Sequence, residues 1–280
     1  MTSKVWFITG TSKGFGRVWA EAALERGDKV AATARDVSTL HELVARHGDD
    51  VLPLALDVTD RDADIAAVQE AHAHFGRLDV VVNNAGYGLF GMVEEISEEQ
   101  ARAQLETNLL GALWVTQAAL PILREQRSGH IIQVSSIGGV HAFPTLGLYH
   151  ASKWGLEGFS QALAAEIAPF GVNVTIVEPG GFATDWAGPS AVHAEALPAY
   201  AEIKEAFGRA AAERRGNPGD PAATGEAILE LVDAEEPPLR LFLGEAPLSM
   251  IRAEYAARLE TWEAWQDLAR RAQGSMEVAR

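Results

Sequence analysis

The chain has 280 residues, a formal net charge of −16 and no cysteine. The acidic balance argues against nucleic acid and anionic membrane surfaces as partners, because both bind clustered lysine and arginine. The lack of cysteine excludes disulfides, thiolate catalysis and thiolate zinc sites, and the length suits one large α/β domain.

Targeting signals are also missing from the sequence. No apolar run approaches the length of a membrane span, and no signal-peptide pattern precedes the first predicted strand. We therefore expect a cytoplasmic protein with no membrane partner and no metal site.

The first predicted strand, residues 5–9, runs into the glycine turn Gly10-Thr-Ser-Lys-Gly-Phe-Gly16 and a predicted helix over 18–26. Backbone N–H groups and a helix N-terminus in this arrangement can receive a pyrophosphate, and glycines allow the tight turn and close approach. The same glycines could instead serve only to pack a helix on a strand. The candidate cofactor-binding residues here are Gly10, Ser12, Lys13, Gly14, Phe15 and Gly16.

A second strand is predicted over 29–34, with Arg35 following it and a helix over 38–47. The end of such a strand faces the adenosine ribose of a bound dinucleotide, where an acid binds a 2′-hydroxyl and a 2′-phosphate needs cations. Arg35 could also be an ordinary solvated loop cation.

The third predicted strand, residues 51–56, contains Pro53, which a sheet tolerates at an edge or a strand start. Asp57 follows it and could cap a helix. After a helix through Phe75, the fourth predicted strand, 78–82, leads into Asn83-Asn-Ala-Gly86.

The amides and glycine of that tetrad can satisfy loop backbone groups and let a cofactor approach closely. Tyr87 and Phe90 follow as an expected pocket wall. A helical stretch over 98–123 contains Asn108, which is disfavoured in mid-helix unless its side chain bonds to backbone. A packing or surface asparagine is the alternative.

The stretch from Val134 to Lys153 can bring three reactive side chains to one point. Tyr149 and Lys153 lie four residues apart on a helix predicted over 149–168, so they share a face. An ammonium roughly 4 Å from the phenol would lower the tyrosine pKa by up to about three units before desolvation is subtracted. That change would suit a general acid/base. Taken alone, such a pair is also typical of a helix surface.

Ser136 follows a strand predicted over 130–135 and could donate a hydrogen bond to the carbonyl oxygen that Tyr149 protonates. Two serines after a strand could equally form a turn. Between Ser136 and Tyr149 the chain is mostly apolar, and Val140, His141 and Phe143 are predicted to line a substrate cleft.

Together these stretches resemble the short-chain dehydrogenase/reductase family, with six motifs in order between Lys4 and Thr184. The motifs are Thr9-Gly-x-x-x-Gly-x-Gly16, Asp57-Val58, Asn83-Asn-Ala-Gly86, Asn108, Ser136 with Tyr149-x-x-x-Lys153, and Pro179-Gly180. The resemblance implies an α/β doubly wound, Rossmann-like fold. It has a mostly parallel seven-stranded sheet in the order 3-2-1-4-5-6-7 with helices on both faces.

The resemblance also implies reversible hydride transfer between NADP(H) and the carbonyl or secondary alcohol of an apolar small molecule. Tyr149 would be the acid/base, Ser136 would polarise the oxygen, Lys153 would lower the tyrosine pKa, and Asn108 would complete a water relay. A catalytically silent protein that senses NADP on the same fold is the alternative. An epimerase or dehydratase is a further alternative.

The family's acidic ribose-binding position is Ala34 here, and Lys13 and Arg35 match basic positions of NADP-preferring members. Asp57 and Val58 would flank the adenine. The remaining implied cofactor contacts are Asn84, Ala85, Gly86, Tyr149, Lys153, Pro179, Gly180 and Thr184.

The last third of the chain is predicted to hold a strand over 173–177, a substrate lid over about 185–217 with Trp186 in the pocket, and a helix over 221–233. A final strand over 239–243 and a helix over 250–272 follow. We expect a Rossmann domain over 1–245 and a C-terminal helical extension of the same domain over 246–280. The helix from Tyr149 commonly meets its symmetry mate in this family, which implies a homo-oligomer; an ordinary core helix explains its apolar pattern too.

Overall fold

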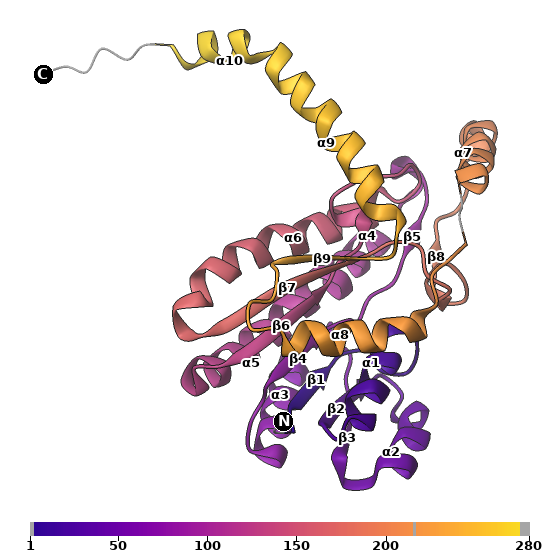
Figure 1. Ribbon diagram of the computed structural model, residues 1–280. Coiled ribbons are helices and arrows are strands. Elements are labelled where there is room, and N and C mark those ends of the chain that lie inside the picture. Colours follow the sequence, from indigo (N-terminus) through magenta and orange to yellow (C-terminus); the bar gives the residue numbers. More distant parts are fainter. Residues whose placement is uncertain (1–2, 215–216, 275–280) are drawn as a thin grey trace, which may run out of the picture.

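Seven parallel strands form the central sheet of the computed structural model, which describes residues 3–214 and 217–274 (Figure 1). Their order across the sheet is β3-β2-β1-β4-β6-β7-β9. The strands are β1 Val5–Ile8, β2 Lys29–Ala34, β3 Val51–Ala55, β4 Val80–Asn83, β6 Gly129–Val134, β7 Val172–Pro179 and β9 Arg240–Leu243. The predicted doubly wound order is confirmed, and β3 with its proline lies at an edge.

Alternation along β1 explains why both faces of the sheet are covered. Trp6 and Ile8 point into one apolar cluster, whereas Val5 and Phe7 point into another, as the two-residue period of a strand requires. All four residues are buried. A strand that is apolar at every position therefore sits between two layers of helices.

The helices divide between these two clusters. On the Trp6 face lie α1 (Gly14–Glu25), α2 (His41–His47) and α8 (Thr224–Asp233). On the Val5 face lie α3 (Arg61–Phe75), α5 (Gly111–Gln126) and α6 (Gly147–Ile167). Because all the strands run the same way, their carboxyl ends meet at one edge of the sheet, where ligands bind in folds of this kind.

Some helix bounds differ from the prediction. The stretch predicted as one helix over 98–123 is α4 (Glu98–Leu105), a π-helical turn at Glu106–Leu110 and α5. α6 begins at Gly147, so Tyr149 lies within its first turn rather than opening it. The predicted helix over 250–272 is α9 (Ala246–Ala264) followed by α10 (Gln266–Gln273).

Within the described part of the predicted lid the only α-helix is α7 (Ala201–Arg214), which follows short 3-10 turns at Asp185–Ala187 and Pro198–Tyr200, and residues 215–216 lie outside the described part of the chain. Before α7 the chain forms β8 (Val192–His193), which pairs in parallel with β5 (Leu89–Phe90). This two-stranded sheet was not predicted, because two-residue strands carry no periodic signal. It ties the lid to the loop after the Asn83–Gly86 tetrad.

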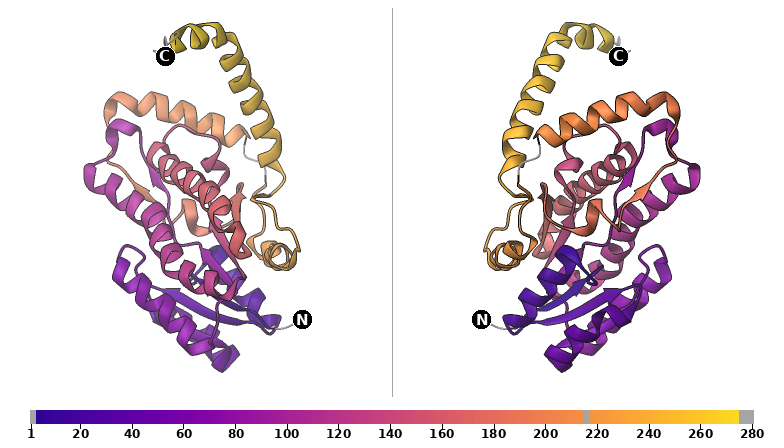
Figure 2. Two further views of the ribbon diagram at one scale, coloured as in Figure 1. Left: turned by 90° about the vertical axis from the view of Figure 1, so that its left-hand side faces the viewer. Right: turned by 90° about the vertical axis from the view of Figure 1, so that its right-hand side faces the viewer.

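α9 and α10 form an arm that extends past the body of the molecule (Figures 1 and 2). The arm exposes large apolar side chains, including those of Trp262 and Trp265. Within residues 3–214 and 217–274, none of the helices combines the length and apolar character that crossing a membrane needs.

Candidate active site

The glycine turn between β1 and α1 leaves a helix N-terminus open to an anion. Lys13 is the N-cap residue but makes no side-chain capping bond, and the first turn of α1 contains no acid. Gly10 has φ +71°, and a Cβ at Gly16 would lie 2.4 Å from the Gly10 carbonyl oxygen. Uncapped N–H groups, a helix dipole and glycines that permit this turn fit the phosphates of a dinucleotide.

The tetrad after β4 is bonded to that turn. Thr9 Oγ1 accepts from the backbone N–H groups of Asn84 and Ala85, both at 2.9 Å. Asn84 Nδ2 donates to the carbonyl oxygens of Thr9 at 2.9 Å and Gly10 at 3.0 Å. Asn83 instead turns away, donating to Thr116 and Gln133 and so steadying β4 against its neighbours.

The two cations predicted to face the ribose differ in their surroundings. Arg35 is exposed at the end of β2 and makes no hydrogen bond or ion pair with any other described residue. Lys13 Nζ lies 3.4 Å from Asp185 Oδ2, and both side chains are about half exposed. Ala34 is buried and offers no carboxylate at this position.

Other predicted cofactor residues have structural partners of their own. Asp57 Oδ1 accepts from the N–H and hydroxyl of Thr59, while α3 is capped by Asp60, so the predicted helix cap at Asp57 is a turn bond instead. Val58 is buried against Gly111. The Phe15 ring is half-buried and stacks on Trp19, and Ser12, Gly14 and Gly86 are exposed or half-buried at the turn edges.

The loop after β7 supplies the remaining predicted contacts. Pro179 is buried, and the Gly180 N–H donates to the Leu243 carbonyl at 2.9 Å. Thr184 Oγ1 accepts from the Trp186 N–H at 3.5 Å. These contacts hold the loop at the carboxyl edge of the sheet, where the resemblance places the nicotinamide.

Ser136, Tyr149 and Lys153 are brought together as predicted. The Ser136 side chain lies near enough to the Tyr149 hydroxyl to act on the pKa of the phenol. Lys153 Nζ lies 6.0 Å from the centre of the Tyr149 ring and donates to the Val134 carbonyl oxygen at 2.7 Å. A Cβ at Gly138 would lie 3.1 Å from the Tyr149 ring, so a glycine there allows the loop after Ser136 to approach closely.

Burial changes the pKa of both α6 groups. It raises the pKa of Tyr149 to about 12, while the nearby Ser136 side chain acts in the opposite direction. Burial lowers the pKa of Lys153 to about 8, against the attraction of Glu157. The expected lowering of the tyrosine pKa by Lys153 is therefore not found, because loss of water outweighs a cation that faces the ring and bonds to Val134.

Asn108 lies in the π-helical turn and is buried. Its Oδ1 accepts from the Tyr87 N–H and its Nδ2 donates to the Tyr87 carbonyl, each at 3.0 Å. Nδ2 also contacts Ser152 Oγ at 3.3 Å. The side chain thus satisfies backbone groups, as a mid-helix asparagine was expected to do.

Of the predicted pocket residues, Trp186 contacts the Tyr149 ring, and Phe90 contacts Trp186. The Trp186 ring centre is 4.9 Å from that of Tyr149 and 5.3 Å from that of Phe90. Tyr87 is half-buried beside Asn108. Val140 is buried, while His141 packs against Phe143 and lies 3.4 Å from Glu254 on α9, which gives it a structural partner.

Sequence reasoning missed two residues that shape the site. His150 Nδ1 donates to the Gly138 carbonyl and its Nε2 accepts from the Phe143 N–H, both at 2.8 Å. Ser152 Oγ donates to the Tyr149 carbonyl at 2.6 Å and so links it to Asn108. Both lie inside the Tyr149 to Lys153 run, but nothing in the run indicates which backbone groups they satisfy.

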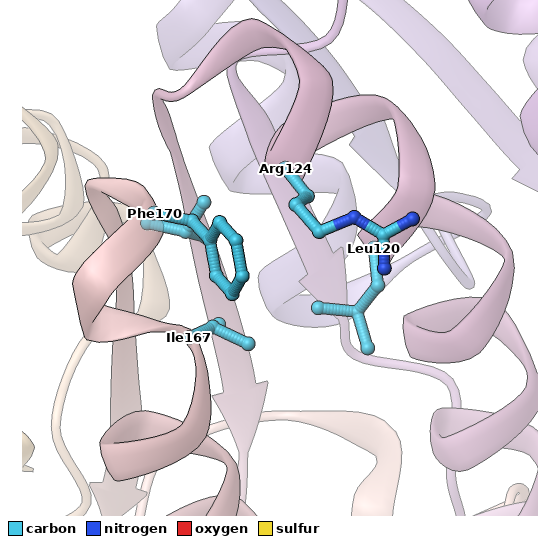
Figure 3. A pocket seen from close by; sticks show the side chains of 5 residues that line it. Leu120, Arg124, Ile167 and Phe170 are labelled. Atoms are coloured by element: carbon cyan, nitrogen blue, oxygen red, sulfur yellow. The ribbon is translucent and has the colours of Figure 1, made fainter.

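Two small cavities lie away from these residues. One, of about 80 Å³, has Leu120 and Arg124 of α5 facing Ile167 and Phe170 across it, with Val172 also in its wall (Figure 3). The other, of about 250 Å³, is lined by His72, Gly76, Ile122, Glu125 and Gln126. Neither involves a predicted site residue, so we assign no role to them.

Comparison with known proteins identifies the same family as the sequence motifs. The model of the family described as short chain dehydrogenase matches residues 4–194. The oxidoreductase BOA17 of Botryotinia fuckeliana (strain B05.10) is 43% identical over 268 residues, covering 95% of this chain and 98% of its own.

Two solved structures extend the comparison. A short-chain dehydrogenase from Streptomyces avermitilis has a TM-score of 0.88 at 38% identity, covering 96% of this chain and 100% of its own. An alcohol dehydrogenase from the archaeon Thermococcus sibiricus, complexed with 5-hydroxy-NADP, has a TM-score of 0.72 at 28% identity, covering 86% of this chain and 96% of its own.

Proposed function

The chain belongs to the short-chain dehydrogenase family and is an oxidoreductase, and on that premise we propose that it is an NADP(H)-dependent carbonyl reductase or alcohol dehydrogenase. Its substrate in this proposal is an apolar small molecule with a ketone, aldehyde or secondary alcohol. One observation carries the proposal. A Cβ at Gly86 would lie 3.7 Å from Lys153 Nζ, so the loop bonded to the glycine turn directly adjoins the Tyr149 site.

When bound, the cofactor supplies or accepts the hydride. The glycine turn and the N-terminus of α1 would hold its phosphates, and Arg35 with Lys13 would bind a 2′-phosphate. Asn84, Ala85 and Gly86 would lie along it. Two features support the fit of the cofactor. The N-terminus of α1 has no side-chain cap, and the Arg35 side chain forms no hydrogen bond or ion pair with another described residue.

Tyr149 would donate a proton to the carbonyl oxygen while Ser136 donates a hydrogen bond to the same atom. With a pKa of about 12, Tyr149 holds its proton at neutral pH, which is the state that reduction of a carbonyl needs. Alcohol oxidation needs the phenolate, so it depends more on the positive charge of Lys153.

Asn108 would complete the relay that returns a proton to Lys153. Its bonds to Tyr87 and Ser152 fix the π-helical turn beside the site. The same proposal places the protein in the cytoplasm as a homo-oligomer. Support for assembly comes from α6, whose outer surface exposes Trp154 at 41% of its area.

The test is a panel of carbonyl compounds with NADPH, followed by loss of absorbance of the reduced nicotinamide. We expect turnover with at least one apolar ketone or aldehyde, and loss of it in Tyr149→Phe. NADPH binding without oxidation by any carbonyl would overturn the proposal and favour a silent cofactor sensor.

A further inference from the structure

Trp186 covers the group proposed to donate the proton. Its ring meets that of Tyr149 at 4.9 Å and 59°, and that of Phe90 at 5.3 Å and 58°. A Cβ at Gly88 would lie 2.8 Å from the indole, so the absence of a side chain there makes room for it. The indole thus occupies space beside Tyr149 that a substrate must reach.

Few bonds hold the indole in this place. Trp186 lies on a short 3-10 turn, Asp185–Ala187, and its backbone N–H makes a long 3.5 Å bond to Thr184. Its ring N–H has no hydrogen-bond partner within residues 3–214 and 217–274. The neighbouring ion pair between Asp185 and Lys13 is half exposed, and such pairs are weak. The indole is therefore held by packing against Tyr149 and Phe90, and no hydrogen bond of its ring has to break when it moves.

The surfaces that the indole contacts are aromatic. Beyond Phe90, the ring of His193 stacks at 5.2 Å and 23°, so a row of rings extends from Tyr149 to the small β5–β8 sheet. Rings favour other flat rings through their quadrupoles beyond the area they bury. Because the indole of Trp186 fits against the rings of Tyr149 and Phe90, a ligand that replaces it should have a similar size and flat shape.

Charged ligands find no free partner here. Lys153 is buried and donates to the Val134 carbonyl oxygen, and the side chains that contact the indole, those of Tyr149 and Phe90, are neutral rings. Glu95 is likewise engaged by Lys204 at 2.8 Å. The site therefore suits a neutral ligand.

The geometry points to a self-occluded substrate site: Trp186 stands where the substrate binds, and the substrate is a neutral carbonyl compound with a flat conjugated ring system of about the size of indole. That the ligand contains a carbonyl group rests on the proposed function. That it contains a flat ring system rests on the position of Trp186 alone. On binding, this ring system displaces the indole and contacts Tyr149 and Phe90 in its place.

Two quantitative expectations follow. Each aromatic contact adds a factor of roughly two to twelve in affinity beyond buried area, so a flat ketone should bind at least about fivefold tighter than its saturated counterpart. If the indole covers the site in part of the molecules, the apparent affinity of a ligand is lowered in proportion to the fraction in which the site is open. Removing the indole removes this loss. Trp186→Ala should therefore bind both ketones about threefold tighter or more.

The experiment measures binding of 2-acetylnaphthalene and of its saturated counterpart, 2-acetyldecalin, by calorimetry without cofactor. It uses the full chain and Trp186→Ala, with Trp186→Phe as a milder variant expected to lie between them. Tryptophan emission is followed in parallel and corrected for absorption by the ligand, because displacement of Trp186 should change the emission of the full chain more than that of Trp186→Ala. Trp262→Ala, at an exposed position in the arm, is the matched control.

Tighter binding in Trp186→Ala, with a preference for the flat ketone, supports the inference. Equal affinity for the two ketones, or weaker binding in both Trp186 variants, overturns it. The same titrations in Tyr149→Phe, where no proton is available, separate the two proposals. If the unmodified chain reduces no carbonyl but the flat ketone still displaces Trp186, the proposed function is wrong and the inferred binding site is supported.

Discussion

The surroundings of Tyr149 and the C-terminal third of the chain are held in place in different ways. Tyr149 and Asn108 are 5% and 1% exposed, and neighbouring backbone and side-chain groups bond to both of them. Phe207 of α7 and Trp265 of the arm are 38% and 64% exposed. The chain itself therefore fixes the geometry of the proposed catalytic site, whereas the lid and arm expose apolar surface.

The largest effect should come from the fixed region. Tyr149→Phe removes one hydroxyl and leaves the ring against Trp186, so we expect turnover to fall at least about a hundredfold, the range of general acid catalysis. NADPH affinity should change less than about twofold. Single-turnover oxidation of NADPH and a binding titration measure the two quantities.

The matched control is Tyr255→Phe, which removes the same hydroxyl from an exposed tyrosine of α9. It should leave turnover unchanged. Activity of Tyr149→Phe within a few-fold of the unmodified chain would mean that burial at this position serves packing alone, and the contrast between the two regions would lose its functional meaning.

Arg35 should give the next largest effect. A guanidinium that bonds a phosphate contributes roughly 1.5 to 3 kcal/mol, so Arg35→Ala should weaken NADPH binding about ten- to a hundredfold and leave NADH nearly unchanged. Ala34→Asp should reverse the preference by repelling the 2′-phosphate. Dissociation constants for both cofactors, at low and moderate salt, measure this.

Arg46→Ala is the control for general charge loss, since Arg46 is an exposed cation paired with Glu25 on the same side of the sheet. It should affect both cofactors equally and weakly. Equal losses for NADPH and NADH in Arg35→Ala would show that Arg35 is only a solvated surface cation.

The fold and the reactive pair could be predicted because their signals are local. Trp6 and Ile8 alternate with Val5 and Phe7 over a run short enough to be a strand, and the spacing from Tyr149 to Lys153 is one helical turn. Strand order, by contrast, came from the family resemblance. Alternation alone gives no information about which strand is next to which.

What could not be predicted depends on distant contacts. The pKa of Tyr149 is set by how completely the fold removes water, which the spacing of two residues does not contain. His150 and the β5–β8 pairing depend on loops that meet only after folding. The position of Trp186 over Tyr149 requires Gly88, nearly a hundred residues away in sequence.

A third prediction concerns the buried carboxyl of Glu178 on β7, near Glu157 of α6. Burial, together with nearby Glu157, raises the pKa of Glu178 to about 8 although Arg240 lies 3.3 Å away. This folded value lies above the ordinary one, so the stabilising contribution is complete below about pH 4.5 and is lost as the pH rises through 8. Glu178→Gln should reduce the fall in unfolding free energy between pH 5 and 9 by about 1 to 4 kcal/mol.

Urea unfolding at pH 5, 7 and 9 measures this, with the exposed Glu166→Gln on α6 as the control. The control should keep the pH dependence of the unmodified chain. Parallel curves for Glu178→Gln and the unmodified chain would indicate that Arg240 compensates the buried charge, and that the region behind Tyr149 is less isolated from water than its exposure suggests.

The smallest effect is expected in the arm. The first half of α9 contacts the body through buried Pro247 beside Gly180, through Glu254 near His141 and through Arg258 over Trp154. Residues 261–274 are exposed and make no hydrogen bond, ion pair or ring contact with the described residues of the body. A chain ending at Glu260 should therefore unfold within about 0.5 kcal/mol of the full chain, whereas one ending at Gly244 should lose about 1 to 3 kcal/mol.

Thermal unfolding at two protein concentrations distinguishes the possible results, since 1 kcal/mol corresponds to about 2 to 4 °C for a domain of this size. If the arm serves only its own molecule, shortening it to Glu260 changes the midpoint little at either concentration. If a second copy covers Trp262 and Trp265, the full chain has the higher midpoint and loses that advantage on dilution. A concentration-independent loss of several degrees would contradict both readings, because it would mean that exposed residues stabilise the body that they do not contact.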